Sequence, residues 1–397
     1  MNALDGITVL EFGSGAAGPL ATRYFADHGA TVIRVESRAR PDFLRLYGIT
    51  ATQPSLDASP MFAAFNCNKL AVTLNLKHRE GVALAIRLVD RADVVAENFA
   101  PGAMDRLGLG YEALAAHKPG LVMVSTCLHG QTGPERDYPG FGGQGSALSG
   151  FNHLTGWPDR EPLGPHGTIT DSLSPRFAAV AVLAALWRRD RTGLGCHLDL
   201  SQVEAAEYCL SEMLVEHQAT GAPPGRRGSR SARTAPHGIY PCAGDDRWIA
   251  IAVWSDDQWR ALAVEAGIDD RRLDGVAGRL EHVEELDAAL GAWTRARDRN
   301  GLAQALRARG IEATPVADME DLISDTQLHH RTHLHPMEHP VIGVQPYESL
   351  GIRLADSPPS FTGSGPTLGR DNEDVFCGIL GLTPEEYRRL DAHGAFS

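Results

Sequence analysis

The chain has 397 residues, of which 43% are hydrophobic and 22% are charged. This length exceeds what one ordinary core accommodates, so we expect two or three domains in a chain of typical globular composition. The formal net charge of −13 argues against a non-specific nucleic-acid binder. The six cysteines are scattered and form no C-x-x-C pair, which argues against a zinc ribbon or a redox dithiol.

The sequence shows no membrane or export signal. No uninterrupted apolar run reaches the ~18 residues that a membrane span requires. The N-terminus, residues 1–6, has neither the basic region nor the apolar region of a secretory signal. We therefore expect a cytoplasmic protein without a membrane partner.

The first part of the chain alternates between strands and helices. Strands are expected at residues 7–12, 31–36, 71–76, 93–97 and 121–126, with helical patterns between them. This alternation predicts an α/β fold with a mainly parallel, doubly wound sheet.

The organisation changes after residue 127. Residues 128–171 form a long stretch rich in Gly, Pro, Asp and His, which is typical of a functional or a disordered loop. Helices are expected at 175–189 and 202–217, followed by a basic linker at 219–235. A strand pair, several helices and a short strand then predict a smaller α+β domain. The expected segments are 1–224, 225–325 and a C-terminal part, 326–397, that returns to the first domain.

A glycine-rich motif follows the first strand. Residues 13–18 (GSGAAG) match the pattern G-x-G-x-x-G, and Glu36 ends the next strand, as in NAD-dependent oxidoreductases. Pro19 argues against a close copy of that motif, because proline is tolerated only in the first turn of a helix. Backbone N–H groups at a helix start can still hold a phosphate, so we expect an adenine nucleotide to bind here.

Basic side chains occur at or just beyond several expected strand ends, where open α/β sheets bind ligands. They are candidates to face a pyrophosphate or a ribose phosphate. The alternative is that each is a solvated surface charge. These residues are Arg34, Arg38, Lys69, Lys77 and Arg106.

Several ordered segments resemble the family III CoA-transferases, which include formyl-CoA transferase, crotonobetainyl-CoA:carnitine CoA-transferase and methylacyl-CoA racemase. The resemblance covers nearly the whole chain. It is carried by residues 4–11 (LDGITVLE), 30–36 (ATVIRVE), Asn66, Lys69, Leu74 and Lys77, 97–102 (ENFAPG), 130–134 (GQTGP), Thr170-Asp171, 236–242 (PHGIYPC) and 365–370 (GPTLGR).

The resemblance implies both an architecture and an activity. It implies a Rossmann-like large domain with an inserted smaller α+β domain, in an interlocked homodimer. It also implies transfer of CoA from an acyl-CoA to a small free carboxylic acid. Coenzyme A and acyl-CoA would then be substrates, with no permanently bound cofactor.

The resemblance places the catalytic aspartate at Asp171. This residue precedes the helix expected from residue 175, whose positive end would stabilise a carboxylate or an oxyanion. A carboxylate can attack a thioester to give a mixed anhydride and then an aspartyl-CoA thioester. The alternative role is a plain helix N-cap. Residues 140–143 are expected to shift over the site and shield the thioester from water.

The CoA contacts that the resemblance implies lie on several segments. Arg34 and Arg38 flank one family arginine position, and the sequence does not choose between them. The other contacts are Gly13, Ser14, Gly15 and Ala16 in the first turn, Leu74, Lys77 and Arg106, with Arg136 as a weaker assignment.

Three other functions stay open. Phe141 stands where racemases of the family need a histidine, which disfavours an acyl-CoA racemase or isomerase, although His129 and His166 lie nearby in sequence. An NAD-dependent oxidoreductase rests on the motif at 13–18 and on Glu36. The third is a non-catalytic partner subunit, which the retention of Asp171 argues against.

Two further classes of site are not expected. Five histidines lie between residues 329 and 339, but without a nearby cysteine or a patterned carboxylate we expect no metal. The G-x-S-x-G pattern of many serine hydrolases is absent from the sequence.

Overall fold

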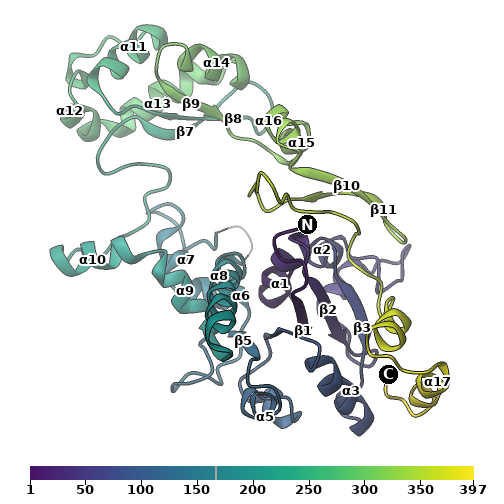
Figure 1. The fold of residues 1–397 in the computed structure, drawn as a ribbon. Coiled ribbons are helices and arrows are strands. Elements are labelled where there is room, and N and C mark those ends of the chain that lie inside the picture. The colour runs from purple at the N-terminus through teal and green to yellow at the C-terminus, as the bar shows by residue number, and fades with distance from the viewer. Residues whose placement is uncertain (166–167) are drawn as a thin grey trace. The chain divides into compact units, whose positions relative to one another are not determined.

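The computed structural model describes residues 1–165 and 168–397, which form two compact units (Figure 1). The first unit comprises Met1–Asn152, Gly164–Pro223 and His329–Ser397, and the second comprises His153–Leu163 and Pro224–Leu328. The expected domain boundaries, after residues 224 and 325, leave residues 153–163 in the large domain. In the structure, residues 153–163 belong to the second unit. The sequence of this loop has no periodic pattern that would have predicted this.

A six-stranded sheet forms the centre of the first unit. The strands are β1 (Thr8–Phe12), β2 (Thr31–Glu36), β3 (Leu70–Thr73), β4 (Val94–Glu97), β5 (Val122–Cys127) and β6 (Cys196–Ser201). Their order is β3-β2-β1-β4-β5-β6, and every neighbouring pair is parallel. The expected parallel sheet is therefore confirmed. Because the strand order reverses at β1, a crevice for ligands is expected at the carboxyl ends of β1 and β4.

Strand β6 was not expected from the sequence. Its residues alternate between partly buried and exposed positions and end at the buried Ser201. The strand lies at the edge of the sheet, so it lacks the continuous apolar run of a central parallel strand. It nevertheless brings the residue that follows it to the carboxyl edge of the sheet.

The first unit also contains helices and a two-stranded antiparallel ribbon. The helical elements are α1 (Ala17–Asp27), η1 (Phe43–Gly48), α2 (Pro60–Phe65), α3 (Arg79–Val89), α4 (Ala103–Arg106), α5 (Tyr111–His117), α6 (Gly142–Leu148), α8 (Ile169–Thr192), α9 (Gln202–Tyr208), α10 (Ser211–Thr220), η3 (Asp374–Ile379) and α17 (Pro384–Ala392). The ribbon pairs β10 (Leu334–His339) with β11 (Gly343–Glu348). Two short helices, α7 (Phe151–Leu154) and α16 (Thr326–His330), lie where the chain passes between the units.

Each face of the sheet carries its own hydrophobic core, because successive side chains of a strand point to opposite faces. Leu10 and Phe12 of β1 share a core with residues of α3, α5 and α17. Val9 of the same strand belongs to a second core, formed with α1 and α8. Leu390 and Phe396 lie in the first core, so the C-terminal segment packs on the first unit.

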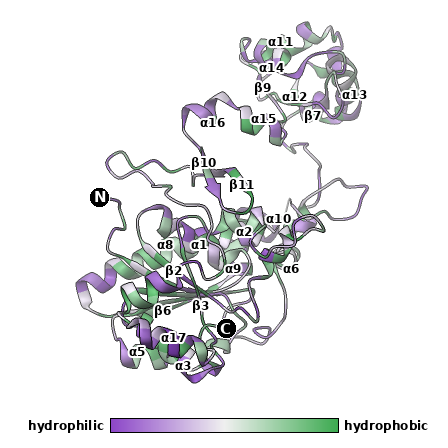
Figure 2. Ribbon diagram, turned by 90° about the vertical axis from the view of Figure 1, so that its right-hand side faces the viewer, coloured by the Kyte–Doolittle hydropathy of each residue, from purple (hydrophilic) through white to green (hydrophobic). Residues whose placement is uncertain are grey.

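Helix α8 is 24 residues long and, by length and composition, apolar enough to cross a membrane. No uninterrupted apolar run in α8 reaches the ~18 residues of a membrane span, so the sequence did not predict one here. Helix α8 is apolar on average, although polar residues are interspersed along it. Its Ala178, Val182 and Leu186 lie in the core that α8 shares with α1. Figure 2 shows how hydropathy varies along α8 and α1. We therefore interpret α8 as a core helix of the α/β fold.

The second unit is an α+β domain built on a three-stranded antiparallel sheet. Its strands, in the order β7-β8-β9, are β7 (His237–Pro241), β8 (Trp248–Ala252) and β9 (Glu312–Pro315). The core joins Ile249 and Ile251 to Trp259 and Leu286 of the helices. These helices are α11 (Asp256–Ala266), η2 (Arg271–Leu273), α12 (Val276–Glu281), α13 (Val283–Thr294), α14 (Arg299–Arg307) and α15 (Met319–Ser324).

Candidate active site

Asp171 lies in the first turn of α8, the helix that connects β5 to the parallel strand β6. A helix that joins two parallel strands runs antiparallel to them, so the N-terminus of α8 lies at the carboxyl edge of the sheet. The backbone N–H groups and the dipole of this helix end favour a negative charge on Asp171. The helix begins at residue 169, earlier than expected, and places Asp171 inside its first turn.

Both carboxylate oxygens of Asp171 accept a hydrogen bond. The Thr168 hydroxyl donates to Oδ2 at 2.6 Å, and the Gln202 side-chain amide donates to Oδ1 at 3.0 Å. Burial raises the pKa of Asp171, and these two hydrogen bonds oppose the rise. No charged side chain among the described residues contributes to that shift. Asp171 is thus a half-buried carboxylate held by neutral donors, and a carboxylate in this environment can act as a nucleophile.

Gly142, the first residue of α6, lies directly against Asp171. A Cβ atom at this position would be 2.3 Å from Asp171 Oδ2 and 2.5 Å from Thr168 Cβ. The Gly142 carbonyl accepts a hydrogen bond from the Thr170 hydroxyl at 3.1 Å. Within residues 140–143, which were expected to move over the site, Gly142 is a buried helix start packed against Thr168 and Asp171. The neighbouring Gly143 has open space around it.

An aromatic contact links this segment to the turn after β1. The exposed ring of Phe141 lies 5.5 Å from the ring of Phe43, measured between centroids. Phe43 in turn packs so closely against Gly15 that a Cβ there would lie 2.9 Å from the ring. Because Gly15 also has a φ of 78°, only glycine fits this point of the turn without strain. The Gly13–Ala16 turn and Asp171 therefore belong to one contiguous region of the first unit.

The N–H groups of this turn are partly used within the protein. Ser14 N–H donates to Asn98 Oδ1 at 2.9 Å, and Asn98 returns a hydrogen bond from Nδ2 to the Ser14 carbonyl at 2.8 Å. Gly15 N–H donates to both carboxylate oxygens of Asp42, at 3.0 and 3.1 Å. Ser14 and Ala16 are the half-buried residues of the turn, and Gly13 and Gly15 are buried. A ligand would therefore meet the turn at Ser14 and Ala16 rather than at free N–H groups of Ser14 and Gly15.

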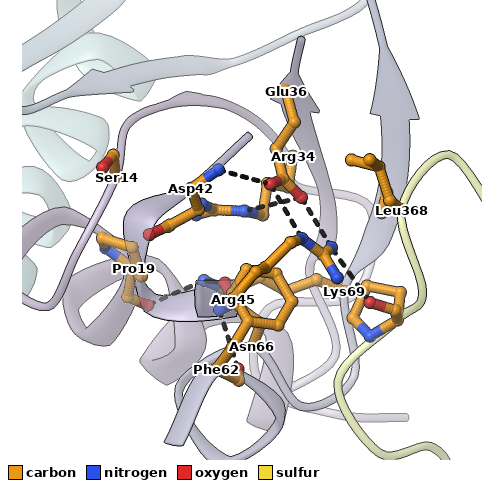
Figure 3. A network of polar contacts seen from close by, with 12 residues as sticks. Ser14, Pro19, Arg34, Glu36, Asp42, Arg45, Phe62, Asn66, Lys69 and Leu368 are labelled. Carbon is orange, nitrogen blue, oxygen red and sulfur yellow. Dashed lines mark hydrogen bonds and ion pairs between the residues drawn. The ribbon is translucent and has the colours of Figure 1, made fainter. Parts of the chain in front are cut away.

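A buried network of ion pairs lies behind the turn (Figure 3). Arg34 is fully buried and pairs with Glu11, Asp42 and Glu36, and it also donates to the Gly13 carbonyl at 3.2 Å. The Lys69 ammonium lies 2.8 Å from Glu11. Burial alone would raise the pKa of Glu11, but Lys69 and Arg34 outweigh it and lower that pKa to about 2.

This network corrects two of the expected ligand contacts. Arg34 and Lys69 are 0% and 1% exposed, and their charges are already matched by carboxylates, so neither reaches a bound phosphate directly. Of the two arginines between which the sequence did not choose, Arg38 is the exposed one. Leu74 is likewise fully buried in the hydrophobic core, so its side chain is not available to a ligand.

Glu36 is also engaged in the network. Arg45 donates to Glu36 at 2.7 and 3.0 Å, and the side chain of Glu36 is 2% exposed. An acid that binds the ribose of NAD must be free to accept hydrogen bonds from its hydroxyl groups. This removes the main support, beyond the glycine motif itself, for an NAD-dependent oxidoreductase.

The remaining expected cations are exposed and lie beyond the carboxyl ends of successive strands. Arg38 follows β2, Lys77 follows β3, Arg106 ends α4 after β4, and Arg136 lies in the loop after β5. Arg136 is 3.5 Å from Asp137. Within the described part of the chain, no ion pair engages Arg38, Lys77 or Arg106. These cations are therefore placed to attract an anionic ligand to this edge.

Sequence reasoning missed two polar residues of this edge. Gln202 directly follows the unexpected strand β6 and is 6% exposed. Glu97 ends β4, and burial raises its pKa to about 7 against hydrogen bonds from Ser125 and the Phe99 N–H. The position of Glu97 at the end of an expected strand, next to Asn98, was a signal in the sequence that could have identified it as a residue of this edge.

The histidines considered earlier have other environments. His129 lies edge-on against the ring of Tyr138, and His166 lies outside the described residues. His335 stacks on Phe361 at 3.8 Å, and His339 Nδ1 accepts the Val341 N–H at 3.2 Å. These contacts give the two latter histidines structural roles.

Comparison with known proteins identifies the family. The family model described as CoA-transferase family III matches residues 4–372. The chain belongs to this family. The succinyl-CoA–D-citramalate CoA-transferase of Chloroflexus aurantiacus is 35% identical over 393 residues, which cover 98% of this chain and 97% of that protein. The chain is therefore a family III CoA-transferase by sequence along its whole length.

Other relatives agree with this assignment. The succinate–glutarate CoA-transferase of Agrobacterium fabrum is 31% identical over 94% of each chain. The acetyl-CoA:oxalate CoA-transferase of Acetobacter aceti is 35% identical over 72% of this chain and 73% of that protein. A crystal structure of a CAIB/BAIF family protein from Brucella suis superposes with a TM-score of 0.88 at 29% identity, covering 96% of this chain and all of that one.

Proposed function

We propose that this family III enzyme transfers CoA from an acyl-CoA to a free carboxylic acid through covalent intermediates on Asp171. The observation that carries the proposal is the environment of this carboxylate. It is half-buried at the positive end of α8, and its oxygens are held by two neutral donors. A raised pKa and partial desolvation make a carboxylate a better nucleophile than it is in water.

The proposed reaction consists of four substitutions, each of which exchanges one anion for another. An Asp171 oxygen attacks the thioester carbonyl, the C–S bond breaks, and the products are a mixed anhydride and CoA thiolate. The thiolate attacks Cγ of Asp171 and releases the donor acid, which leaves an aspartyl-CoA thioester. The acceptor carboxylate then displaces the thiolate from Cγ, and the thiolate attacks the acceptor acyl carbon to regenerate Asp171.

The exposed cations supply the proposed site for the CoA phosphates. Arg38, Lys77 and Arg106, with Arg136 as a further candidate, follow the strands β2, β3, β4 and β5, which flank β1 in the sheet. Arginine and lysine are the side chains that proteins use for phosphates, and basic residues at this edge offset the overall charge of −13 locally. Ser14 and Ala16 provide the half-buried part of the turn against which the nucleotide packs.

The proposed donor is a short or dicarboxylic acyl-CoA, and the acceptor is a small carboxylic acid. The names of relatives support this class of substrates, since they specify succinyl-CoA or acetyl-CoA and citramalate, glutarate or oxalate for those proteins. A racemase is disfavoured because Phe141 has no exchangeable proton and its ring rests on Phe43. CoA is a substrate in this scheme and not a resident cofactor.

The assembly and compartment are further parts of the proposal. We expect an interlocked homodimer in the cytoplasm, in which each chain carries its own Asp171. The alternative is a chain that needs a different partner subunit, as the alpha and beta subunits named for the succinyl-CoA–L-malate CoA-transferase of Chloroflexus aurantiacus illustrate for that enzyme. Activity of the isolated chain distinguishes these two possibilities.

The test of the proposed function is a transfer assay with purified protein. Succinyl-CoA or acetyl-CoA is incubated with a panel of mono- and dicarboxylic acids, and new acyl-CoA products are separated by liquid chromatography. The proposal predicts transfer to at least one acid by the wild type and no transfer by Asp171→Ala. Transfer by Asp171→Ala at the wild-type rate would contradict the role of this residue.

A further inference from the structure

Gln202 is the least expected neighbour of Asp171. Its side-chain amide points at Oδ1 of Asp171, and the contact joins residues 31 positions apart in the sequence. With 6% of its surface exposed, the side chain of Gln202 is shielded from water. A buried amide is costly unless it is hydrogen-bonded, so the pairing with Asp171 is strongly favoured.

The backbone around Gln202 is fixed from both sides. The Ser201 hydroxyl donates to the Leu128 carbonyl at 3.1 Å and accepts the Glu204 N–H at 3.2 Å, which caps α9. Val203 N–H donates to the same Leu128 carbonyl at 3.1 Å. Gln202 therefore begins a capped helix that is anchored to the end of β5, and its amide is preorganised toward Asp171.

A neutral donor suits the changes of charge that Asp171 undergoes. In the proposed route Asp171 is an anion at rest and an uncharged acyl group in the anhydride and the thioester. A cation at this place would bind the resting anion most strongly and thereby slow its attack. An amide N–H interacts with the carboxylate, with the acyl carbonyl and, most strongly, with an oxyanion.

We infer that Gln202 is a further catalytic residue, whose side-chain N–H stabilises the negative charge that forms on Oδ1 when Cγ of Asp171 is attacked. In the second substitution, the thiolate adds to Cγ, the C=O pair moves onto Oδ1, and its return expels the donor carboxylate. In the third, the acceptor carboxylate adds to Cγ in the same way, and the collapse of the oxyanion breaks the bond from Cγ to sulfur and expels the CoA thiolate. No proton is transferred, and Gln202 is unchanged after each step.

Thr168 has a different role in this scheme. Its hydroxyl donates to Oδ2, and it precedes α8 by one residue, so we assign it as a positioning residue for the resting carboxylate. The two oxygens of Asp171 therefore have different partners, Thr168 at Oδ2 and Gln202 at Oδ1. Thr168→Val is the matched comparison, because it removes a donor to the same carboxylate from the other side.

The inference rests on the proposed aspartyl route and is tested with Gln202→Leu and Gln202→Met in the full-length protein. Both variants remove the donor and put an apolar side chain of similar size in place of the amide. We expect kcat to fall about 10²–10³-fold in both variants, which is the usual cost of removing one such donor. The KM for acyl-CoA should change by less than about threefold, because the hydrogen bond, already made to the resting carboxylate, strengthens in the transition state.

The pH profile separates catalysis from mere positioning. The Gln202 hydrogen bond also opposes the raised pKa of Asp171, so its loss moves the acid limb of kcat/KM to higher pH. If Gln202 acted only on the resting carboxylate, raising the pH would restore kcat. We expect the loss in Gln202→Leu to persist on the alkaline plateau, and Thr168→Val to recover there to within about tenfold of the wild type.

Three outcomes would overturn the inference. They are a kcat within about threefold of the wild type on the plateau, a loss confined to KM, and recovery of both Gln202 variants at high pH. Thermal unfolding of each variant identifies a folding defect. If one of the two Gln202 variants is misfolded, the kinetics of the other one test the inference. If the wild type itself forms no aspartyl adduct with acyl-CoA, the proposed function fails and the inference falls with it. If the adduct forms but the variants are unaffected, only the inference fails.

Discussion

At the scale of single residues, the tightest constraint on Asp171 is its contact with the backbone of Gly142. A side chain at this position would overlap with Oδ2 of Asp171, whose carboxylate two hydrogen bonds hold in place, and with Cβ of Thr168, which cannot move without its backbone. The carboxylate and the start of α6 are therefore fitted to each other. Displacement of a reacting group by as little as 1 Å is costly in catalysis.

We predict that Gly142→Ala lowers kcat by at least about 10²-fold, because the new methyl group forces Asp171 or α6 out of place. The matched control is Gly143→Ala, since a Cβ at Gly143 meets no atom within 4 Å. The control should keep kcat within about twofold of the wild type, because alanine is favoured over glycine in a helix. Steady-state kinetics of the two variants side by side is the measurement. Equal activities would show that the Gly142 contact does not constrain Asp171.

The residue scale is also where the sequence was least informative. Asp171 was found through a family resemblance, and its fit to Gly142 and Gln202 depends on contacts between segments that are distant in the chain. The sequence treated Arg34 and Arg38 alike, because both are arginines near the end of one strand. Burial separates them, and burial depends on the carboxylates of Glu11 and Asp42, which neither spacing nor composition reveals.

At the scale of elements, the carboxyl ends of the parallel strands collect the site. The turn after β1 is braced by Asp42 and Asn98, and the exposed cations follow β2, β3, β4 and β5. This arrangement follows from the parallel direction of the strands, which brings the carboxyl ends of all of them to one edge. The same direction places the start of α8 and of α9 there, with Asp171 and Gln202.

Arg106 provides a test of this edge as the phosphate site. We predict that Arg106→Ala raises the Kd for CoA about tenfold at ~10 mM salt and less at ~500 mM, because salt screens exposed charges. Isothermal titration with CoA at the two ionic strengths measures the effect. The control is Arg91→Ala, an exposed arginine in the turn before β4 and therefore at the opposite edge of the sheet. An identical Kd for wild type and Arg106→Ala at both salt concentrations would remove Arg106 from the site.

The elements were predictable where their patterns were strong. The first five strands, β1 to β5, have continuous apolar or β-branched runs, and the sequence located all five. Strand β6 has only partly buried residues before Ser201, and as an edge strand it gives a weak signal. Its omission hid Gln202, since a residue is recognised as lying at a strand end only when the strand is known. The start of α8 was placed too late because Pro175 suggested a first turn, whereas here it lies inside the helix.

At the scale of the whole molecule, the helices after β5 expose large apolar side chains. Trp187 of α8, Tyr208 of α9, and Leu214 and Val215 of α10 are between 56% and 72% exposed. Helix α10 has 10 residues, none of which is buried. A helix shorter than ~12 residues is marginal in water unless it packs on something. These features support a second copy of the chain as the partner that covers this surface.

We predict that the wild type sediments at twice the mass of one 42.7 kDa chain and that Val215→Glu dissociates this assembly. The reason is that a charge would be buried without a partner in a largely apolar interface. Analytical ultracentrifugation is the measurement. Val264→Glu on α11, where the side chain is 83% exposed, is the control and should leave the mass unchanged. A monomeric wild type would contradict the proposed homodimer.

The central claim is that Asp171 carries the transferred groups, and intact-protein mass spectrometry tests it most directly. The wild type and Asp171→Ala are incubated with a panel of acyl-CoAs that includes succinyl-CoA, and their masses are compared before and after treatment with hydroxylamine. The account predicts a CoA or acyl adduct on the wild type that hydroxylamine removes and that Asp171→Ala lacks. An adduct of the same yield on Asp171→Ala, or transfer activity without any adduct on the wild type, would contradict it.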